Sequence, residues 1–299
     1  MPLNRLIRLE CRSLFELFIL PALSLLMPWP LAYRVLRRVA RYPGLYEAEW
    51  KPALAQALSL GLVQIDDPLD WAWRYRTCRL VDHADYWLSR LRRESWLRRH
   101  ADRRGEWPVL QGAAVGAFFH WCAGMWGVRA LLAAGYPSSV LAGRFSKRSM
   151  GGARVGYLYG HMRSRELARA SGGPLIYAPR TVQQSLAALA AGRWVIGTPD
   201  VPPSETRMSV PVRLFGRTGY MPEGLLLIAR KAAVPVVIFT LGLDFDSGRR
   251  DLRVFGPFDA NDPDLMQRIA DTWEGLIREK SWGFTLWPAM PAFFAKPAD

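Results

Sequence analysis

The sequence is poor in the side chains that build disulfide frameworks and zinc sites. It has three cysteines among 299 residues, Cys11, Cys78 and Cys122, and only four histidines. The odd number and wide spacing of the cysteines exclude a disulfide framework, and no paired C-x-x-C zinc motif is present. We therefore expect a reducing compartment, no bound metal and no other cofactor. Half of the residues are apolar and 22% are charged, which excludes a disordered chain.

Acidic residues are scarce relative to basic ones. Twenty-six Asp and Glu stand against 40 Lys and Arg, which gives a net charge of +14. Such a charge attracts nucleic acid, an acidic membrane surface or an acidic protein, and does not distinguish among them. The sequence contains no zinc finger, aromatic RNA-binding motif or recognition-helix pattern, so we expect no nucleic-acid partner.

A long hydrophobic run is also missing, although the N-terminal region is apolar. Residues 17–32 carry no charge, but three prolines interrupt them, and a bilayer span needs about 20 apolar residues. Basic residues flank this stretch, no signal-peptide cleavage pattern follows it, and Trp29 beside arginines is typical of a membrane interface. A kinked span, an interfacial or re-entrant anchor and a buried helical hairpin all fit. We predict that residues 1–42 form a helical, membrane-associated segment.

The rest of the chain divides into two patterns. Residues 43–107 are predicted to be helical, with one long helix over residues 69–99. Over residues 108–280, short apolar runs alternate with helical patterns, which is typical of βα units and a parallel sheet. We predict an α/β fold with a mostly parallel central sheet flanked by helices. It forms one domain over 43–299, in which 281–299 are a tryptophan-rich tail.

His120 is the histidine best placed for chemistry. It ends the apolar run AAVGAFFH, a predicted strand, and stands before a predicted helix. The carboxyl ends of parallel strands gather at one edge of a sheet, where the active sites of α/β folds form. A neutral imidazole there can act as a general base, and a buried structural histidine is the alternative. We expect His83, His100 and His161 to be structural or surface residues.

Four blocks of sequence follow one another along the chain. They are FFHWCAGMW around His120; PLIYAPRTVQQSLAALAAGRWVIGTPD with Arg180 and Asp200; RMSVPVRLFGRTGYMPEGLLLIARKAAVPVVIFTL with Glu223 and Gly224; and SWGFTLWPAMPAFF. In this order and spacing they resemble the bacterial lipid A late acyltransferases and lysophospholipid acyltransferases of the glycerol-phosphate acyltransferase superfamily. The resemblance covers nearly the whole chain.

The resemblance implies an acyltransferase at the cytoplasmic face of the bacterial inner membrane. In that family an acceptor group attacks an acyl thioester, usually on an acyl carrier protein, while a histidine takes the proton. By this resemblance His120 is the general base and the acyl carrier protein is a partner, with coenzyme A as the other possible donor. The acceptor is a hydroxyl or amine of a membrane lipid or glycolipid.

The family's acid is absent from its usual position. The hallmark is a histidine, four residues and then Asp or Glu, and here that position holds Met125. The acid fixes the imidazole tautomer and stabilises the cation that forms. Asp200 ends the apolar run WVIGTPD, and adjacent parallel strands present their carboxyl ends on one side, so we predict that Asp200 replaces it. Glu223 is the second candidate, and a capping role is the alternative for Asp200.

Residues 137–180 carry a dense positive charge. Their single acid is Glu166, and their net charge is +7. The eight basic residues are Arg144, Lys147, Arg148, Arg154, Arg163, Arg165, Arg169 and Arg180. Positive charge suits the phosphates of an acceptor or the acidic face of a carrier protein. We predict that Arg144, Lys147 and Arg180 bind substrate and that the others lie on a solvated helix face. The resemblance adds Glu223 and Gly224 to the substrate site.

Two other functions fit the same residues. The methionine at the acid position favours a membrane-associated lipid- or acyl-binding protein that has lost catalysis. Attack by water instead of an acceptor would make the chain an acyl thioesterase that uses the same histidine.

Overall fold

The computed structural model of the protein describes residues 3–144, 146, 152–205 and 208–296. The central sheet of this part has seven strands: β1 (Ala101–Arg104), β2 (Val115–Ala117), β3 (Ser138–Leu141), β4 (Leu175–Ile176), β5 (Trp194–Gly197), β8 (Val236–Leu243) and β9 (Arg250–Phe258). Their spatial order is β1-β9-β8-β2-β5-β3-β4. A separate antiparallel hairpin consists of β6 (Ser209–Leu214) and β7 (Arg217–Pro222).

Neighbouring strands of the central sheet are parallel, except that β8 and β9 are antiparallel. The predicted α/β fold with a mostly parallel sheet is therefore confirmed. β2 lies between β5 and β8, and Gly116 is paired with Ile196 on one side and with Val237 on the other. β8 is apolar along its whole length, VVIFTLGL, and buried throughout, as expected for an interior strand covered on both faces.

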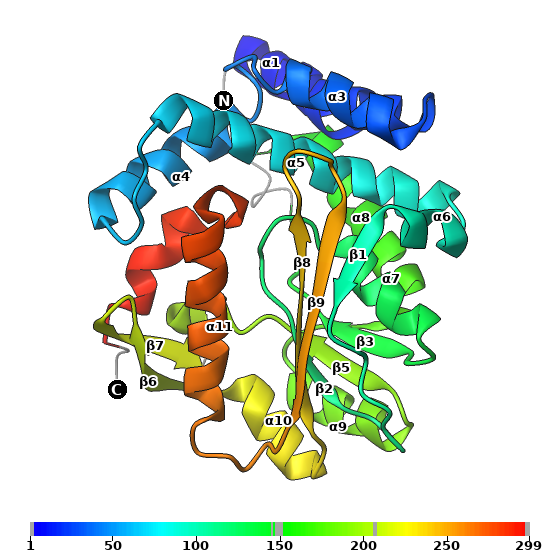
Figure 1. Cartoon of the computed structure of the whole chain (residues 1–299), viewed down its shortest axis with the longest axis vertical. Coiled ribbons are helices and arrows are strands. Elements are labelled where there is room, and N and C mark those ends of the chain that lie inside the picture. Colours follow the sequence, from blue (N-terminus) through cyan, green and yellow to red (C-terminus); the bar gives the residue numbers. More distant parts are fainter. Residues whose placement is uncertain (1–2, 145, 147–151, 206–207, 297–299) are drawn as a thin grey trace.

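Helices surround the sheet. They are α1 (Leu3–Leu14), α2 (Leu20–Ala22), α3 (Trp29–Val39), α4 (Glu47–Leu60), α5 (Pro68–Leu91), α6 (Glu94–Arg99), α7 (Met125–Ala133), α8 (Arg154–Ser171), α9 (Thr181–Ala190), α10 (Gly224–Ala232) and α11 (Leu265–Glu279). Figure 1 shows α7 and α8 on one side of the long strands β8 and β9, and α11 on the other. α5 crosses the upper end of these strands, with α1 and α3 above it (Figure 1).

The long helix α5 is started by its own sequence. The Asp67 carboxylate accepts hydrogen bonds from the amides of Leu69 and Asp70, and Pro68 occupies the first helical position. The 24 residues of α5 give it a length of about 36 Å. It is therefore long enough to cover the carboxyl ends of several strands.

The prediction of a single helix over residues 69–99 is wrong at one point. The backbone of Arg92 and Arg93 is extended, so α5 ends and α6 begins separately. The guanidinium of Arg129 in α7 donates to the Arg92 carbonyl (2.9 Å). This carbonyl therefore has a hydrogen-bond partner from another element instead of one from a continuous helix. A tertiary hydrogen bond thus overrides the local helix propensity.

The described part of the N-terminal segment is helical, as predicted, and it packs on the rest of the chain. Trp29, which we expected at a membrane interface, is 1% exposed and donates from Nε1 to the Gly248 carbonyl (2.9 Å). Tyr33 donates its hydroxyl to the Phe245 carbonyl (2.5 Å). The expectation for Trp29 is wrong because carbonyls near the β8–β9 turn satisfy these polar aromatic side chains. Within the described ranges, no helix combines the length and apolarity that a membrane span requires.

A buried arginine joins four elements beneath this segment. Arg250, which begins β9, forms an ion pair with Asp85 of α5, and neither side chain is exposed. The guanidinium lies 4.0 Å from the ring centre of Trp29 in α3 and 4.2 Å from that of Trp126 in α7. Aromatic faces attract such a cation, and a buried charge without partners would be costly. The pair therefore links α3, α5, α7 and β9.

We expect Trp29→Ala to lower the free energy of unfolding by about 3–5 kcal/mol, the usual cost of truncating a buried Trp. The change removes buried apolar surface, the hydrogen bond to Gly248 and one ring against Arg250. Chemical denaturation measures the loss. Leu31→Ala is the matched control on the same helix, because Leu31 is half exposed and its truncation should cost less than about 1 kcal/mol. Equal losses in the two variants would contradict this account.

Candidate active site

His120 lies in the loop that follows β2. The strand ends at Ala117, so the expectation that it extends to His120 is wrong by three residues. Phe118 still donates its amide to the carbonyl of Gly197, the last residue of β5 (2.9 Å). The chain then leaves the sheet because the His120 amide bonds to a side chain, that of Asp200, instead of a strand. The loop nevertheless places His120 at the carboxyl edge of the sheet, as predicted.

Asp200 holds both the backbone and the ring of His120. Its Oδ2 accepts the His120 amide (2.6 Å), and its Oδ1 lies 2.9 Å from His120 Nδ1. Asp200 comes three residues after β5, which is parallel to β2, and its side chain is 0% exposed. Because the two strands are parallel neighbours, their carboxyl ends bring these residues together. The juxtaposition of Asp200 and His120 that the sequence predicted is present.

This pairing determines which imidazole nitrogen is free. A carboxylate only accepts hydrogen bonds, so Nδ1 carries the proton and Nε2 keeps a lone pair. The His120 side chain is 39% exposed, which leaves the ring accessible. Burial lowers the pKa of the imidazole, but the charge of Asp200 and its hydrogen bond outweigh this and place the pKa above its usual value. The pair therefore favours the imidazolium that forms when Nε2 accepts a proton.

The C-terminal part of the chain holds the same loop from another side. The His120 carbonyl accepts the amide (3.2 Å) and the hydroxyl (3.3 Å) of Thr285. Cys122 has a φ of +56° and donates its amide to the Gly283 carbonyl (2.7 Å). A Cβ on Gly283 would lie 2.6 Å from Cys122 Sγ, so glycine is required there. No local pattern predicted these contacts, because the partners are about 160 residues apart in the chain.

Met125 and Glu223 supply no acid to His120. Met125 begins α7 and its side chain is buried in the hydrophobic core, so an apolar residue fills the position at which the resembled acyltransferases carry an acid. The Glu223 carboxylate pairs with Arg230 (2.5 Å) and precedes α10. Gly224 begins that helix beside open space. No contact among the described residues brings Glu223 or Gly224 to His120, so their substrate roles stay predictions.

Two of the predicted substrate-binding cations lie at the edge of the sheet that carries His120. Arg144 follows β3, with its guanidinium 4.8 Å from the ring centre of Tyr177, and Arg180 precedes α9; both arginines are exposed. β3 and β4 are parallel to each other, and β3 is parallel to β5, so these residues share the carboxyl edge of the sheet. Lys147 and Arg148 lie outside the described residues.

Arg163 does not belong to a solvated helix face. It extends from α8 to α5 and donates to the Asp82 carboxylate (2.6 Å). The prediction for Arg163 is wrong because the buried Asp82 needs a charged partner between the two helices. The remaining described arginines of α8, Arg154, Arg165 and Arg169, are exposed, as predicted.

The other histidines have structural surroundings, as predicted. His83 is buried in α5 with Nδ1 2.8 Å from the Tyr159 hydroxyl, and burial holds its pKa well below the usual value. His100 Nδ1 lies 2.9 Å from the Trp96 carbonyl. His161 is exposed on α8. His120 is thus the histidine that combines a carboxylate partner with an accessible ring.

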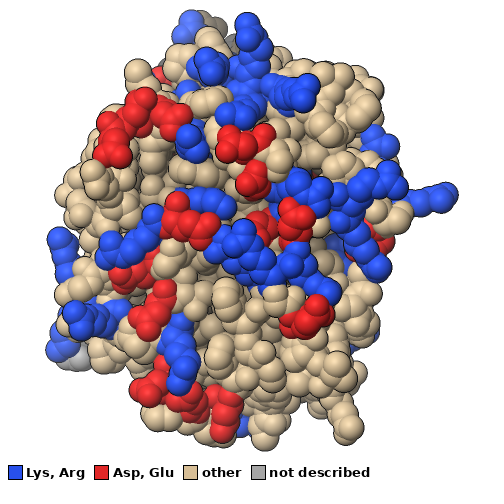
Figure 2. Space-filling model, in the orientation of Figure 1, with Lys and Arg blue, Asp and Glu red and all other residues tan. Residues whose placement is uncertain are grey.

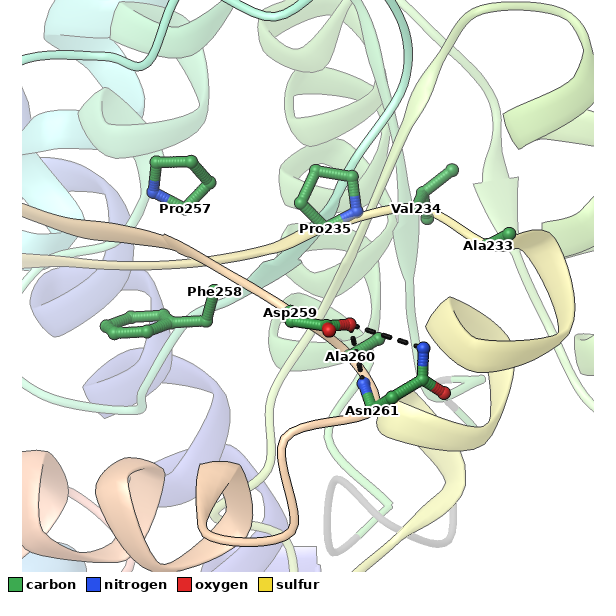
Figure 3. A pocket seen from close by; sticks show the side chains of 8 residues that line it. All are labelled: Ala233, Val234, Pro235, Pro257, Phe258, Asp259, Ala260 and Asn261. Atoms are coloured by element: carbon green, nitrogen blue, oxygen red, sulfur yellow. Dashed lines mark hydrogen bonds between the residues drawn. The ribbon is translucent and has the colours of Figure 1, made fainter.

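Two surface cavities do not include this pair. One of about 340 Å³ opens at the opposite end of the sheet, where β8 starts and β9 ends (Figure 3). There Asp259 accepts hydrogen bonds from the backbone and side-chain amides of Asn261. The other, of about 480 Å³, lies between α6, α7 and β1 and is lined by Trp107, Trp126 and Leu241 among others. Neither cavity is lined by His120.

In the described part of the chain, no group of three His, Cys, Asp or Glu residues is arranged to hold a metal ion.

Neither the protein-family models nor the curated proteins compared with this chain give a significant match. The site is therefore defined by its own geometry. It consists of an oriented imidazole with a free Nε2, a buried carboxylate behind it and arginines along the same edge of the sheet.

We expect Asp200→Asn to lower the pKa of the His120 imidazole. The change removes the charge that raises this pKa, while the burial that lowers it stays. In the parent the ring should titrate above about 6.5, the ordinary value for His, and in the variant at lower pH than in the parent. NMR of ¹⁵N-labelled histidine measures both curves, and the His120→Ala spectrum identifies the signal. Identical titration curves would show that Asp200 does not act on the ring.

Proposed function

We propose that the protein is an acyltransferase. It moves a fatty acyl chain from the thioester of an acyl carrier protein, or of coenzyme A, to a hydroxyl or amine of a lipid or glycolipid. The observation that carries the proposal is the His120–Asp200 pair, in which Asp200 binds Nδ1 and the imidazole side chain is 39% exposed. A base oriented in this way takes a proton from a nucleophile. Such a pair serves several reactions. The resemblance of the four sequence blocks to the acyltransferases favours acyl transfer among them.

In the proposed mechanism, His120 Nε2 accepts the acceptor proton while the acceptor oxygen or nitrogen attacks the thioester carbonyl. Asp200 stays ionised and stabilises the imidazolium through Nδ1. The tetrahedral intermediate then breaks its carbon–sulfur bond, and the leaving thiolate takes the proton from Nε2. His120 returns to its starting state, and no covalent acyl-enzyme forms.

The methionine at position 125 favoured a non-catalytic acyl- or lipid-binding protein. The Asp200 carboxylate, from the turn after β5, instead pairs with the His120 imidazole and supports the catalytic alternative. A thioesterase would use the same pair with water as the nucleophile. The nature of the product, an acylated lipid or a free fatty acid, separates the two reactions.

The acyl carrier protein is the proposed partner of the donor step. Arg144 and Arg180 at the edge of the sheet are exposed, and so are Arg154 and Arg165 on α8. Exposed arginines on this edge and on α8 suit an acidic protein surface, because complementary charges speed the encounter of two proteins. They also suit the phosphates of a lipid acceptor.

We place the proposed reaction at the cytoplasmic face of the bacterial inner membrane. The N-terminal segment exposes large apolar side chains, among them Ile7, Leu14, Phe15, Ile19, Leu26 and Leu31. Exposed arginines accompany them, and Figure 2 shows basic side chains predominating at the top of the view, where α1 and α3 lie. Apolar anchors among basic residues are typical of helices that lie in the interface of an anionic bilayer.

We expect the protein to bind vesicles that contain phosphatidylglycerol, and high salt to weaken this binding. Leu26→Glu should weaken it by roughly tenfold or more, because one buried Leu contributes about 1.5–3 kcal/mol. Val109→Glu is the matched control, since Val109 is also exposed but precedes β2 at the opposite end of the sheet. Vesicle flotation measures the binding. A parent chain that stays unbound at low salt would exclude the membrane proposal.

We expect His120→Ala to slow acyl transfer by roughly a hundredfold or more, the usual contribution of a general base. Asp200→Asn should lower kcat while acceptor binding persists, because an amide does not stabilise an imidazolium. In the parent, the rate should rise with pH through the pKa of His120, since only the neutral ring accepts a proton. Mass spectrometry follows the acylated lipid and the free fatty acid, with carrier-bound and coenzyme A-bound donors compared.

His161→Ala is the matched control for these variants, because His161 is exposed on α8 and should leave the rate unchanged. A His120→Ala protein as fast as the parent would show that His120 is not the base. Absence of transfer and of hydrolysis by the parent, with every donor, would favour the acyl-binding function instead.

A further inference from the structure

A second charged pair, Asp82 of α5 and Arg163 of α8, lies close to the point where the His120 loop contacts α5. Cys78 of α5 and Cys122 of the loop are neighbours, and a hydrogen bond between them raises the pKa of the Cys78 thiol. Asp82 follows Cys78 by four residues, so it lies on the same face of α5, about 6 Å further along the helix. Its carboxylate binds Arg163 of α8. Arg163 therefore reaches α5 one helical turn beyond the residue that contacts the His120 loop.

The guanidinium of Arg163 is held in one orientation. Asp82 accepts from Arg163 Nη2 through Oδ1 (2.6 Å) and from Arg79 through Oδ2 (3.1 Å). The Tyr159 hydroxyl lies 3.5 Å from Arg163 Nη1. A guanidinium has five N–H donors, and these contacts leave several of them without a described protein partner. The Arg163 side chain is 26% exposed, so part of it is open to solvent.

Arg163 and His120 also act on each other electrostatically. The positive charge of Arg163 lowers the pKa of His120, whereas Asp82 raises it. An anion bound to Arg163 would offset the first of these effects. It would therefore raise the pKa of His120, which is a change that can be measured without any catalytic turnover.

We propose that Arg163 binds a phosphate group of one of the two substrates beside His120. The inference rests on the proposed function for the identity of those substrates. The phosphate belongs either to the head group of the lipid acceptor or to the phosphopantetheine arm of the donor. In both cases phosphate oxygens accept paired hydrogen bonds from a guanidinium, and Asp82 orients that guanidinium in advance.

The first test uses the full chain and inorganic phosphate, with chloride at equal ionic strength as the reference. In the parent, NMR of ¹⁵N-labelled histidine should show that phosphate raises the pKa of His120 in a saturable way. Arg163→Gln should abolish this shift. Arg165→Gln should retain it, because Arg165 is exposed on the same helix. The proposal is overturned if the parent shows no shift or if Arg163→Gln shows the same shift.

A second variant protects the test against a folding defect. Arg163→Gln leaves Arg79 on the Asp82 carboxylate, so that buried charge keeps a partner. Arg163→Lys keeps the charge but loses the planar fork that matches phosphate, and should bind phosphate about tenfold more weakly than the parent. Equal phosphate affinity in the Lys variant and the parent would contradict paired recognition by the guanidinium.

Two further probes distinguish the sources of the phosphate. Glycerol 3-phosphate represents the acceptor head group, and phosphopantetheine represents the donor arm. The probe that uses Arg163 should lose about tenfold or more of its affinity in Arg163→Gln, and the KM of the corresponding substrate should rise with little change in kcat. If neither probe loses affinity, the proposal is wrong. An Arg163-dependent phosphate shift without acyl transfer would retain the phosphate site and reject the proposed function.

Discussion

The burial of one arginine constrains the elements around the His120–Asp200 pair. Arg250 has no exposed surface, so its charge depends on Asp85 and on the faces of Trp29 and Trp126. Burial is costly for the acid as well, since it raises the pKa of Asp85 to about 6 although Arg250 opposes this. Because a buried ion pair tolerates the loss of neither partner, α3, α5, α7 and β9 must stay together. α5 is thereby held across the carboxyl end of the sheet.

α5 covers the edge of the sheet that carries His120, and it contributes charged side chains of its own. The helix carries Asp85 toward β9 and, one turn earlier, Asp82 toward α8. Asp85 stabilises the fold through Arg250, whereas Asp82 orients the partly exposed Arg163. A single helix therefore anchors the N-terminal segment and also brings charge to the neighbourhood of His120.

The fold class and the His120–Asp200 pair could be predicted from the sequence, because they follow from local hydrophobic patterns and from the direction of parallel strands. Alternating apolar runs indicated the parallel sheet, and two strand ends pointed to His120 and Asp200. The remaining features depend on residues distant in the chain. The buried state of Trp29 requires the Gly248 carbonyl, and the split of the long helix requires Arg129. Neither partner is visible in a local pattern, because hydrophobicity and helix propensity do not encode which distant polar group is satisfied.

The place of the acid explains why Met125 is compatible with an oriented base. An acid five residues after the histidine would come from the start of α7, where the structure buries Met125 in the core. Asp200 comes instead from the turn that follows the neighbouring strand β5, and its two oxygens bind both the ring and the amide of His120. The ring orientation is thus set by the register of two parallel strands. With the acid supplied by the sheet, the first residue of α7 is free to serve packing alone.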